Sequence, residues 1–412
     1  MGLLGAAGGC AGHAATPPEP APAARRSFHF LPPSILESAS ERYCAWYGEA
    51  RDGVLYFGMA PFWSAMRDAG GDPSGDLRAP GPQAVGRFDL RSERMLAPLD
   101  VAAAAGARAG TWDVLPHPNG RVYFTTFFEP AGWVEPASGA VVHLGALGLG
   151  LNELALGPGG AIGVSRYGGT GGDPDATGSL VVFAPDGALV LEAPLAPPDG
   201  FVVAPKTIAW DPGGARWWIA TDLVRRRDDA PAPASLHPAI VLDAHGRERA
   251  RIEADAEGRE VELQFVRFAP APAPQAGRGA GDGAGVGARG VGAVVVGDEL
   301  RLAELAGGAD PHALVAPGRG LLLDAHFPRA LDFVQDVAFA GDGAVLVTRW
   351  SGIVHVVREG RVESLRMPRH ASARDGAAGL YYAAAATPAG DLCATVCDDA
   401  VAVECAAAAP PR

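Results

Sequence analysis

The chain has little positive charge and none of the compact motifs that mark common catalytic sites. Lys206 is the only lysine among 412 residues, and 34 basic residues against 47 acidic ones leave a net charge of −13. Phosphate binding needs clustered positive charge, so this composition argues against a nucleic-acid surface. The motifs G-x-S-x-G, H-E-x-x-H and paired C-x-x-C are absent, which leaves serine hydrolases, zinc peptidases and zinc ribbons without support. No apolar run is long enough to span a bilayer.

The chain does contain a recurring unit of short strands. From Phe333 to Val357, alternating apolar residues and one continuous apolar run are separated by Gly-containing turns, and a further strand follows at Arg361 to Arg366. Related units recur, and we expect them to begin near Tyr43, Trp112, Leu151, Pro205, Leu263, Phe333 and Leu380. Such repeats predict an all-β fold, a β-propeller of seven four-stranded blades, or of six if the weak fifth unit is only an insertion.

The last unit has three strands, so closure of the ring needs a strand from the other end of the chain. We expect the segment Ser27 to Leu31, SFHFL, to supply this strand. We therefore divide the chain into a leader with a Pro-rich tether, residues 1–26, and one propeller domain, residues 27–412. A low-complexity loop at about 270–290 is expected to lie on the surface of this domain.

The N-terminal sequence MGLLGAAGGCAGH resembles the end of a bacterial lipoprotein signal, with small residues before Cys10. A basic first region and a longer apolar core are missing, so a disordered Ala/Gly leader is the alternative. The lipoprotein interpretation predicts a location in the cell envelope, periplasmic or extracellular, with membrane attachment only through a lipid on Cys10.

Four further cysteines are compatible with disulfides in an exported chain. Cys393 and Cys405 are expected to face each other across neighbouring strands, and Cys44 could meet Cys397 where the first and last blades adjoin. Four small buried thiols are the alternative.

Polar residues recur where the first strand of a unit begins and the second ends, positions that adjoin at one mouth of a propeller channel. Carboxylate and amide oxygens there could hold Ca²⁺ or another divalent cation. The candidate metal ligands of this kind are Asp113, Asn152, Glu153 and Asp336. The candidate residues for binding an anionic or sugar-like ligand are Lys206, Thr207, Gln264, Gln335, Arg166, Tyr167, Arg349 and Trp350. Alternatively, these groups only satisfy the backbone or pair with arginines. His117, His143 and His355 are expected to be structural.

The segment Asn152 to Ser165, NELALGPGGAIGVS, resembles the repeat unit of NHL-repeat and SMP-30/gluconolactonase-like propellers, and weaker similarity covers most of the chain. In SMP-30-like lactonases a divalent cation lies in the channel, held by a Glu from the first blade and by Asn and Asp residues from later ones. The resemblance implies those roles for Asn152 and Asp336, and for Glu41 in the segment ERYCAW.

Two functions follow. The first is a monomeric, non-catalytic propeller of the cell envelope that binds a small ligand, an ion or a protein partner at its channel mouth. The second is a metal-dependent lactonase or hydrolase, in which Asp113, Asn152, Glu153 and Asp336 hold the metal and one carboxylate serves as general base.

Overall fold

The structure is a computed structural model. It describes residues 25–29, 43–61, 84–101, 110–126, 130–148, 150–168, 176–226, 233–255, 258, 260–269, 290–297, 299–305, 310–313, 315, 320–323, 334–367, 380–398 and 401–407. Cys10, Glu41 and the loop at 270–289 lie outside these residues. Within them, no helix is long and apolar enough to cross a membrane.

The described strands form seven antiparallel sheets, which we call blades 1 to 7. Blade 1 contains β2 (Tyr43–Arg51), β3 (Val54–Pro61), β4 (Ala84–Asp89), β5 (Arg94–Met95) and β6 (Leu99–Asp100). Blade 2 contains β7 (Val114–Pro116), β8 (Val122–Phe124), β9 (Gly132–Val134) and β10 (Val141–His143). Blade 3 contains β11 (Leu151–Leu156), β12 (Ile162–Arg166), β13 (Ser179–Phe183) and β14 (Leu189–Pro194). Blade 4 contains β15 (Phe201–Asp211), β16 (Arg216–Arg225), β17 (Ala239–Asp243) and β18 (Glu248–Ile252).

Blade 5 contains β19 (Leu263–Phe268), β20 (Gly290–Val296), β21 (Glu299–Leu305) and β22 (Gly320–Leu322). Blade 6 contains β23 (Val334–Phe339), β24 (Val345–Arg349), β25 (Ile353–Arg358) and β26 (Arg361–Arg366). Blade 7 contains β27 (Leu380–Ala386), β28 (Leu392–Asp398), β29 (Val401–Ala406) and β1 (Arg25–His29). Single 3₁₀ turns, η2 (Gly145–Leu147), η3 (Pro158–Gly160) and η4 (Pro311–Ala313), lie in connections.

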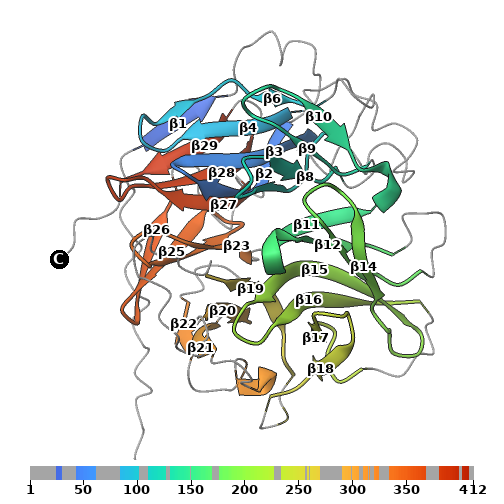
Figure 1. The fold of residues 1–412 in the computed structure, drawn as a ribbon. Helices are drawn as coiled ribbons and strands as arrows, with labels where there is room; N and C mark the ends of the chain where they lie inside the picture. The colour runs from blue at the N-terminus through green and yellow to red at the C-terminus, as the bar shows by residue number, and fades with distance from the viewer. Residues whose placement is uncertain are drawn as a thin grey trace, which may run out of the picture.

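The blades follow one another in chain order around a central axis, with the first strand of each blade innermost (Figure 1). Contacts between successive inner strands run from β2 through β7, β11, β15, β19, β23 and β27 back to β2. The fold is therefore a seven-bladed β-propeller, and the weak fifth unit is a true blade. The prediction of seven blades is confirmed.

Apolar clusters between the blades hold the ring together, one cluster for each neighbouring pair. The strand β24 shows how the sequence produces this arrangement. Successive side chains of a strand point to opposite faces of its sheet, and accordingly Leu346 packs toward blade 7 while Val345 and Val347 pack toward blade 5. Both faces are buried, so the middle strands carry continuous apolar runs.

The strand β1 closes the ring by pairing with β29 in blade 7 (Figure 1, where blue lies beside red). It begins at Arg25, two residues before the expected start. Phe28 packs against Phe88 of blade 1 with a centroid separation of 4.8 Å, and Arg26 forms ion pairs with Glu93 and Asp391. These contacts link the two ends of the chain through side chains as well as through backbone hydrogen bonds.

The disulfide predicted between Cys393 and Cys405 is present; it joins directly paired residues of β28 and β29. Cys397 is also disulfide-bonded, and the side chain of Cys44, its expected partner, lies outside the described part. The alternative of free thiols is therefore wrong for these three cysteines of the last blade.

Candidate functional site

The inner strands carry irregularities at the positions where the sequence predicts a channel site. The pairing register shifts in six of the seven inner strands, which frees one or two residues of each strand from its ladder. These freed residues are Trp46 and Tyr47 in β2, Asn152 and Glu153 in β11, Lys206 and Thr207 in β15, Gln264 in β19, Gln335 in β23, and Tyr382 and Ala383 in β27. Bulges of this kind redirect side chains and are frequent next to functional sites.

The recurring hydroxyl at the end of the second strand has a structural role. Thr125 accepts a hydrogen bond from the Asp113 N–H at 3.2 Å and donates one to the carbonyl of Asn152 on the next blade at 2.6 Å. Ser165 binds the Glu153 N–H at 3.1 Å in the same way, and Thr395 the Ala383 N–H at 2.9 Å. These hydroxyls satisfy the backbone that the bulges leave unpaired, so they are not available to a ligand.

Two of the predicted metal ligands also join neighbouring blades. The Asp113 carboxylate accepts hydrogen bonds from the N–H groups of Val114 at 2.8 Å and of Leu154 at 2.7 Å. The Asp336 carboxylate accepts one from Ala384 at 3.4 Å. The Thr207 hydroxyl likewise accepts a hydrogen bond from the Val266 N–H at 3.3 Å. Both carboxylate oxygens of Asp113 and one of Asp336 are therefore engaged by backbone N–H groups.

One arginine, Arg267, lies among the channel carboxylates. Its guanidinium forms ion pairs with Glu49 at 2.5 Å and Asp336 at 3.3 Å, and its Nε donates to the carbonyl of Val337 at 3.1 Å. Asp113 and Glu153 are close enough for their charges to act on it. Neither Arg166 nor Arg349, the arginines expected beside the acids, has this position.

Burial dominates the ionisation of these acids. It raises the pKa of Asp113 to about 7, although the Leu154 N–H and the charge of Arg267 oppose the change. It raises the pKa of Asp336 to about 6, again against Arg267. For Glu153, burial and the neighbouring charge of Asp113 raise the pKa well above its usual range. One guanidinium does not compensate four carboxylates in a low-dielectric channel, so the site retains protons near neutral pH.

Two side chains of β2 reach across the channel. The hydroxyl of Tyr47 donates to Oε1 of Gln335 in blade 6 at 3.0 Å, and Glu49 pairs with Arg267 in blade 5. Blades 1 and 5 are not neighbours, so the second contact bridges the channel. The Glu49–Arg267 ion pair thus places charged side chains across the channel.

Lys206 belongs to a second charged group, at the mouth in blade 4. Its Nζ lies 2.8 Å from Oδ1 of Asp222, and Nδ1 of His237 lies 2.6 Å from the same oxygen. About a third of each of these three side chains is exposed, at 31%, 36% and 35% in that order. Burial alone would raise the pKa of Asp222, but the hydrogen bond from His237 and the charge of Lys206 lower it below the usual value.

Aromatic residues lie beside both groups. Tyr47 belongs to a cluster with Trp46, Trp112 and Tyr382, with ring centroids 6.5, 5.9 and 5.2 Å from its own. Tyr167, at the end of β12, is half-buried; burial and the charges of Glu153 and Asp222 raise its pKa. The mouth thus combines Tyr47, Glu153, Tyr167, Lys206, Asp222 and His237, from blades 1, 3 and 4.

Several other predicted ligand-binding residues are engaged elsewhere. Arg166 pairs with Glu192 on the outermost strand of its blade and also donates to a backbone carbonyl. Arg349 is buried and donates to Nε2 of His355 at 2.8 Å. Trp350 donates a hydrogen bond to the hydroxyl of Tyr382.

Gln264 stays at the channel, where its Oε1 accepts a hydrogen bond from the Val334 N–H at 3.4 Å. Within the described residues, no group of three or more His, Cys, Asp or Glu side chains is arranged to hold a metal ion. The predicted divalent cation site therefore has no geometric support in this part of the chain, and Glu41 lies outside it.

Tyr47, Glu49, Arg267 and His237 are site residues that the sequence analysis missed. Glu49 lies two positions after Tyr47 on β2, and a period of two places both on the channel side of a strand. This rule does not select Arg267, which lies three positions after Gln264 on β19. His237 follows a long excursion, and no local pattern marks it.

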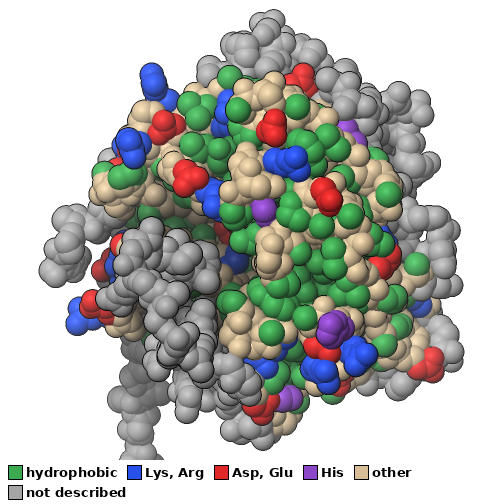
Figure 2. Space-filling view, viewed as in Figure 1, with side chains coloured by type: hydrophobic (Ala, Val, Ile, Leu, Met, Phe, Trp, Pro, Cys, Tyr) green, Lys and Arg blue, Asp and Glu red, His purple; other side chains and the backbone are tan. Residues whose placement is uncertain are grey.

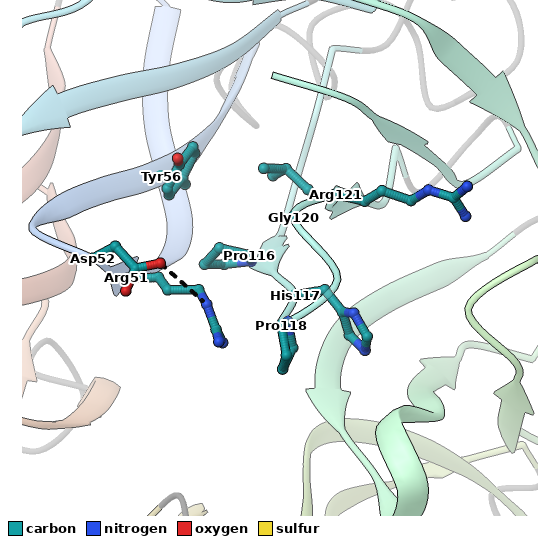
Figure 3. A pocket seen from close by; sticks show the side chains of 9 residues that line it. Arg51, Asp52, Tyr56, Pro116, His117, Pro118, Gly120 and Arg121 are labelled. Atoms are coloured by element: carbon teal, nitrogen blue, oxygen red, sulfur yellow. Dashed lines mark ion pairs between the residues drawn. The ribbon is translucent and has the colours of Figure 1, made fainter. Parts of the chain in front are cut away.

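A second hollow lies between the β2–β3 and β7–β8 turns of blades 1 and 2 (Figure 3). Its volume is about 110 Å³, room for only a few water molecules. His117 borders it, but its Nε2 lies 2.9 Å from the Gly160 carbonyl and its Nδ1 accepts from the Asn119 N–H at 3.1 Å. The guanidinium of Arg121 points away from the hollow (Figure 3). This geometry fits the structural role expected for His117.

Comparison with known proteins supports the fold. No protein-family model matches the chain, and no curated protein matches it, so the resemblance to NHL-repeat and SMP-30-like proteins is not confirmed. A similar solved structure is the extracellular domain of a B. thetaiotaomicron protein described as a hybrid two component system, with 8% identity and a TM-score of 0.52. The match covers 94% of this chain and 40% of that chain. At this identity the likeness shows the propeller fold alone.

Proposed function

We propose that the protein is an exported propeller of the cell envelope that binds a small ligand at the mouth of its channel. The observation that carries this proposal is the group of partly exposed polar and aromatic side chains that three blades bring to one place. Lys206, Asp222 and His237 form its open side, and Glu153 with the two tyrosines its inner side. Convergent polar groups with perturbed pKa values are typical of binding sites.

The location rests on different evidence. The Cys393–Cys405 disulfide favours an oxidising compartment, and the similar B. thetaiotaomicron structure is an extracellular domain. Attachment through Cys10 is testable by metabolic labelling with a palmitate analogue. The label is expected on the wild type and not on Cys10→Ser, and an unlabelled wild type would show that no lipid is attached there.

Surface charge gives no support to a nucleic-acid partner. On the face shown in Figure 2, basic and acidic side chains are interspersed over the described surface. A polyanion needs a continuous basic area. A small molecule in the channel therefore suits the molecule better than a large anionic partner on this face.

The single lysine provides a direct test of the proposed ligand site. Reductive methylation with ¹³C-formaldehyde labels only Lys206 and the N-terminal amine, and the methylated lysine keeps its charge. A panel of small amines, carboxylates and sugars is then titrated and followed by NMR. We expect one class to shift the Lys206 signal saturably, and to shift it less in Asp222→Asn. If no compound shifts this signal at millimolar concentration, the mouth is not a ligand site.

A divalent-metal-dependent lactonase is the second candidate, and one observation favours it. Oδ1 of Asn152 is buried and has no hydrogen-bond partner among the described residues, and an amide oxygen is a suitable ligand for Ca²⁺. The engagement of Asp113 and Asp336 by backbone N–H groups weighs against this candidate. A metalloenzyme would show a calcium-dependent rise in Tm that Asn152→Ala and Asp336→Ala abolish, together with hydrolysis of lactones. No rise in Tm with calcium would exclude it.

A further inference from the structure

Two acceptor groups at the bulge in β11 receive no hydrogen bond from any described residue. Asn152 is only 5% exposed, yet its Oδ1 has no partner among these residues. Its neighbour Glu153 receives a hydrogen bond at its backbone N–H, but no described residue donates to its half-buried carboxyl group. A buried acceptor such as Asn152 Oδ1 is costly without a donor. The two groups are therefore expected to meet a donor that the described residues do not supply.

Aromatic groups lie next to these acceptors. Glu153 is near enough to act electrostatically on the hydroxyls of both Tyr47 and Tyr167. Tyr47 also contacts the aromatic cluster that contains Trp112 and Tyr382. The electron-rich faces of Tyr and Trp attract cations. The acceptors and the rings therefore favour the same kind of ligand.

The charged groups near these acceptors also favour a cationic ligand. Lys206 is matched by Asp222 at 2.8 Å. Below them, a single guanidinium faces the carboxyl groups of Glu49, Asp113, Glu153 and Asp336. The site formed by these carboxyl groups retains protons near neutral pH, and a bound cation would favour their ionised form. A cationic ligand therefore fits this site, and an anionic one does not.

The geometry distinguishes between kinds of cation. Ca²⁺ needs six to eight oxygen ligands around one point, whereas both carboxylate oxygens of Asp113 and one of Asp336 already accept backbone N–H groups. An ammonium group needs only two or three acceptors and benefits from aromatic neighbours. We infer, resting on the proposed function, that the ligand of the channel mouth carries a primary ammonium group, bound by Asn152 Oδ1 and the Glu153 carboxyl group beside Tyr47 and Tyr167.

The test compares benzylammonium chloride with benzyl alcohol, which has nearly the same shape and no charge. Isothermal titration calorimetry of the full chain is expected to show saturable binding of benzylammonium and at least tenfold weaker binding of the alcohol. Glu153→Gln keeps the size of the side chain, prevents it from ionising beside a bound ammonium group and is expected to weaken binding at least tenfold. Asn152→Ala provides a second variant, because it removes a group that no described residue pairs with.

Glu135→Gln is the matched control. Glu135 begins the exposed β9–β10 turn, outside the mouth, and its side chain is 44% exposed. Its variant is expected to bind as the wild type does. Thermal melts of all variants separate lost binding from lost folding.

The outcomes separate this inference from the proposed function. Equal binding of the alcohol, or unchanged binding by both Glu153→Gln and Asn152→Ala, would overturn the ammonium inference. So would calcium chloride binding that depends on Glu153 while benzylammonium does not bind. If carboxylates or sugars shift the Lys206 methyl signal and benzylammonium does not, the inference fails and the ligand site stands. If no class shifts that signal, both fail.

Discussion

Asp113 joins two blades of the fold, and its buried charge also lowers the stability of that fold. Its carboxylate satisfies two backbone N–H groups, one of them on the next blade. It is only 7% exposed, so burial opposes its charged form. The same atoms that join blades 2 and 3 therefore disfavour folding whenever the group is ionised.

This conflict predicts a stability that falls as pH rises. The pKa of Asp113 is raised from 3.8 to about 7 on folding, so the folded chain holds a proton that the unfolded chain releases. Its contribution is complete below about pH 4, is lost progressively up to about pH 7 and is constant above that. The range spans up to about 4 kcal/mol. Asp336, with a folded pKa of about 6, adds in the same direction.

Urea unfolding between pH 4.5 and pH 8 measures this effect. Asp113→Asn is expected to have a flatter pH dependence than the wild type. An amide can accept only one of the two N–H groups, so this variant loses some stability at every pH, and the slope rather than the absolute value decides. Equal slopes in the two proteins would show that Asp113 is not the titrating group.

Arg267 is the second residue whose role can be measured. Arg267→Met leaves Glu49 and Asp336 without their cation, and breaking such a pair is expected to cost about 3 kcal/mol. The double variant Arg267→Met with Glu49→Met should recover part of this loss, because only one of the two carboxyl groups, that of Asp336, is then left without its cation. Chemical denaturation at pH 8 gives both values. A double variant as unstable as the sum of the single ones would show that the two residues do not interact.

At the scale of elements, the inner-strand bulges perform two tasks. They release channel residues from the β-ladder, and they create unpaired backbone groups that Thr125, Ser165 and Thr395 then satisfy. The recurring hydroxyl at the end of the second strand is thus a consequence of the bulges.

The strand β1 predicts a measurable effect of ring closure. Phe28 packs into the cluster that joins blades 7 and 1, and Phe28→Ala is expected to cost about 2 kcal/mol, below the value for a fully buried Phe because the side chain is only partly buried. Val190→Ala on the outer strand β14 is the control, with a loss below about 1 kcal/mol because Val190 is 63% exposed. Equal losses would mean that the apolar contact does not close the ring.

At the scale of the whole molecule, covalent bonds reinforce the place where the chain ends meet. The Cys393–Cys405 disulfide lies in blade 7, as does the disulfide-bonded Cys397. Blade 7 also receives β1, so closure rests on backbone pairing, apolar packing and disulfides together. A blade that separates from the ring loses its contacts with both neighbouring blades. The junction of the chain ends is therefore where we expect the ring to come apart most easily.

Peptide mapping without reduction tests the second disulfide. We expect a linked pair of fragments that contains Cys44 and Cys397, in addition to the pair that contains Cys393 and Cys405. Reduction is expected to lower the free energy of unfolding by about 2–4 kcal/mol for each disulfide. A free thiol at Cys44 in the unreduced protein would contradict the predicted pairing.

The sequence by itself determined the architecture, because propeller blades repeat and local patterns repeat with them. The blade beginning at Leu263 is a degraded unit, yet its alternating run placed β19 at the right residue. The bulge residues Lys206, Gln264 and Gln335 were likewise found from their recurring position. Period-two alternation and turn residues involve only residues close together in the chain, so they can be read directly from the sequence.

Only the tertiary structure decided which charges share the channel. The pairing of Arg267 with Glu49 joins blades that are far apart in the chain and not adjacent in the ring, and His237 reaches Asp222 from a loop. Arg166 and Arg349 sit at the expected strand positions, but their side chains turn into their own blades. Coulomb interactions depend on distance in space, and a long side chain chooses among partners that several blades present together. Local sequence patterns give neither the distances between charges in space nor the partner that a long side chain contacts.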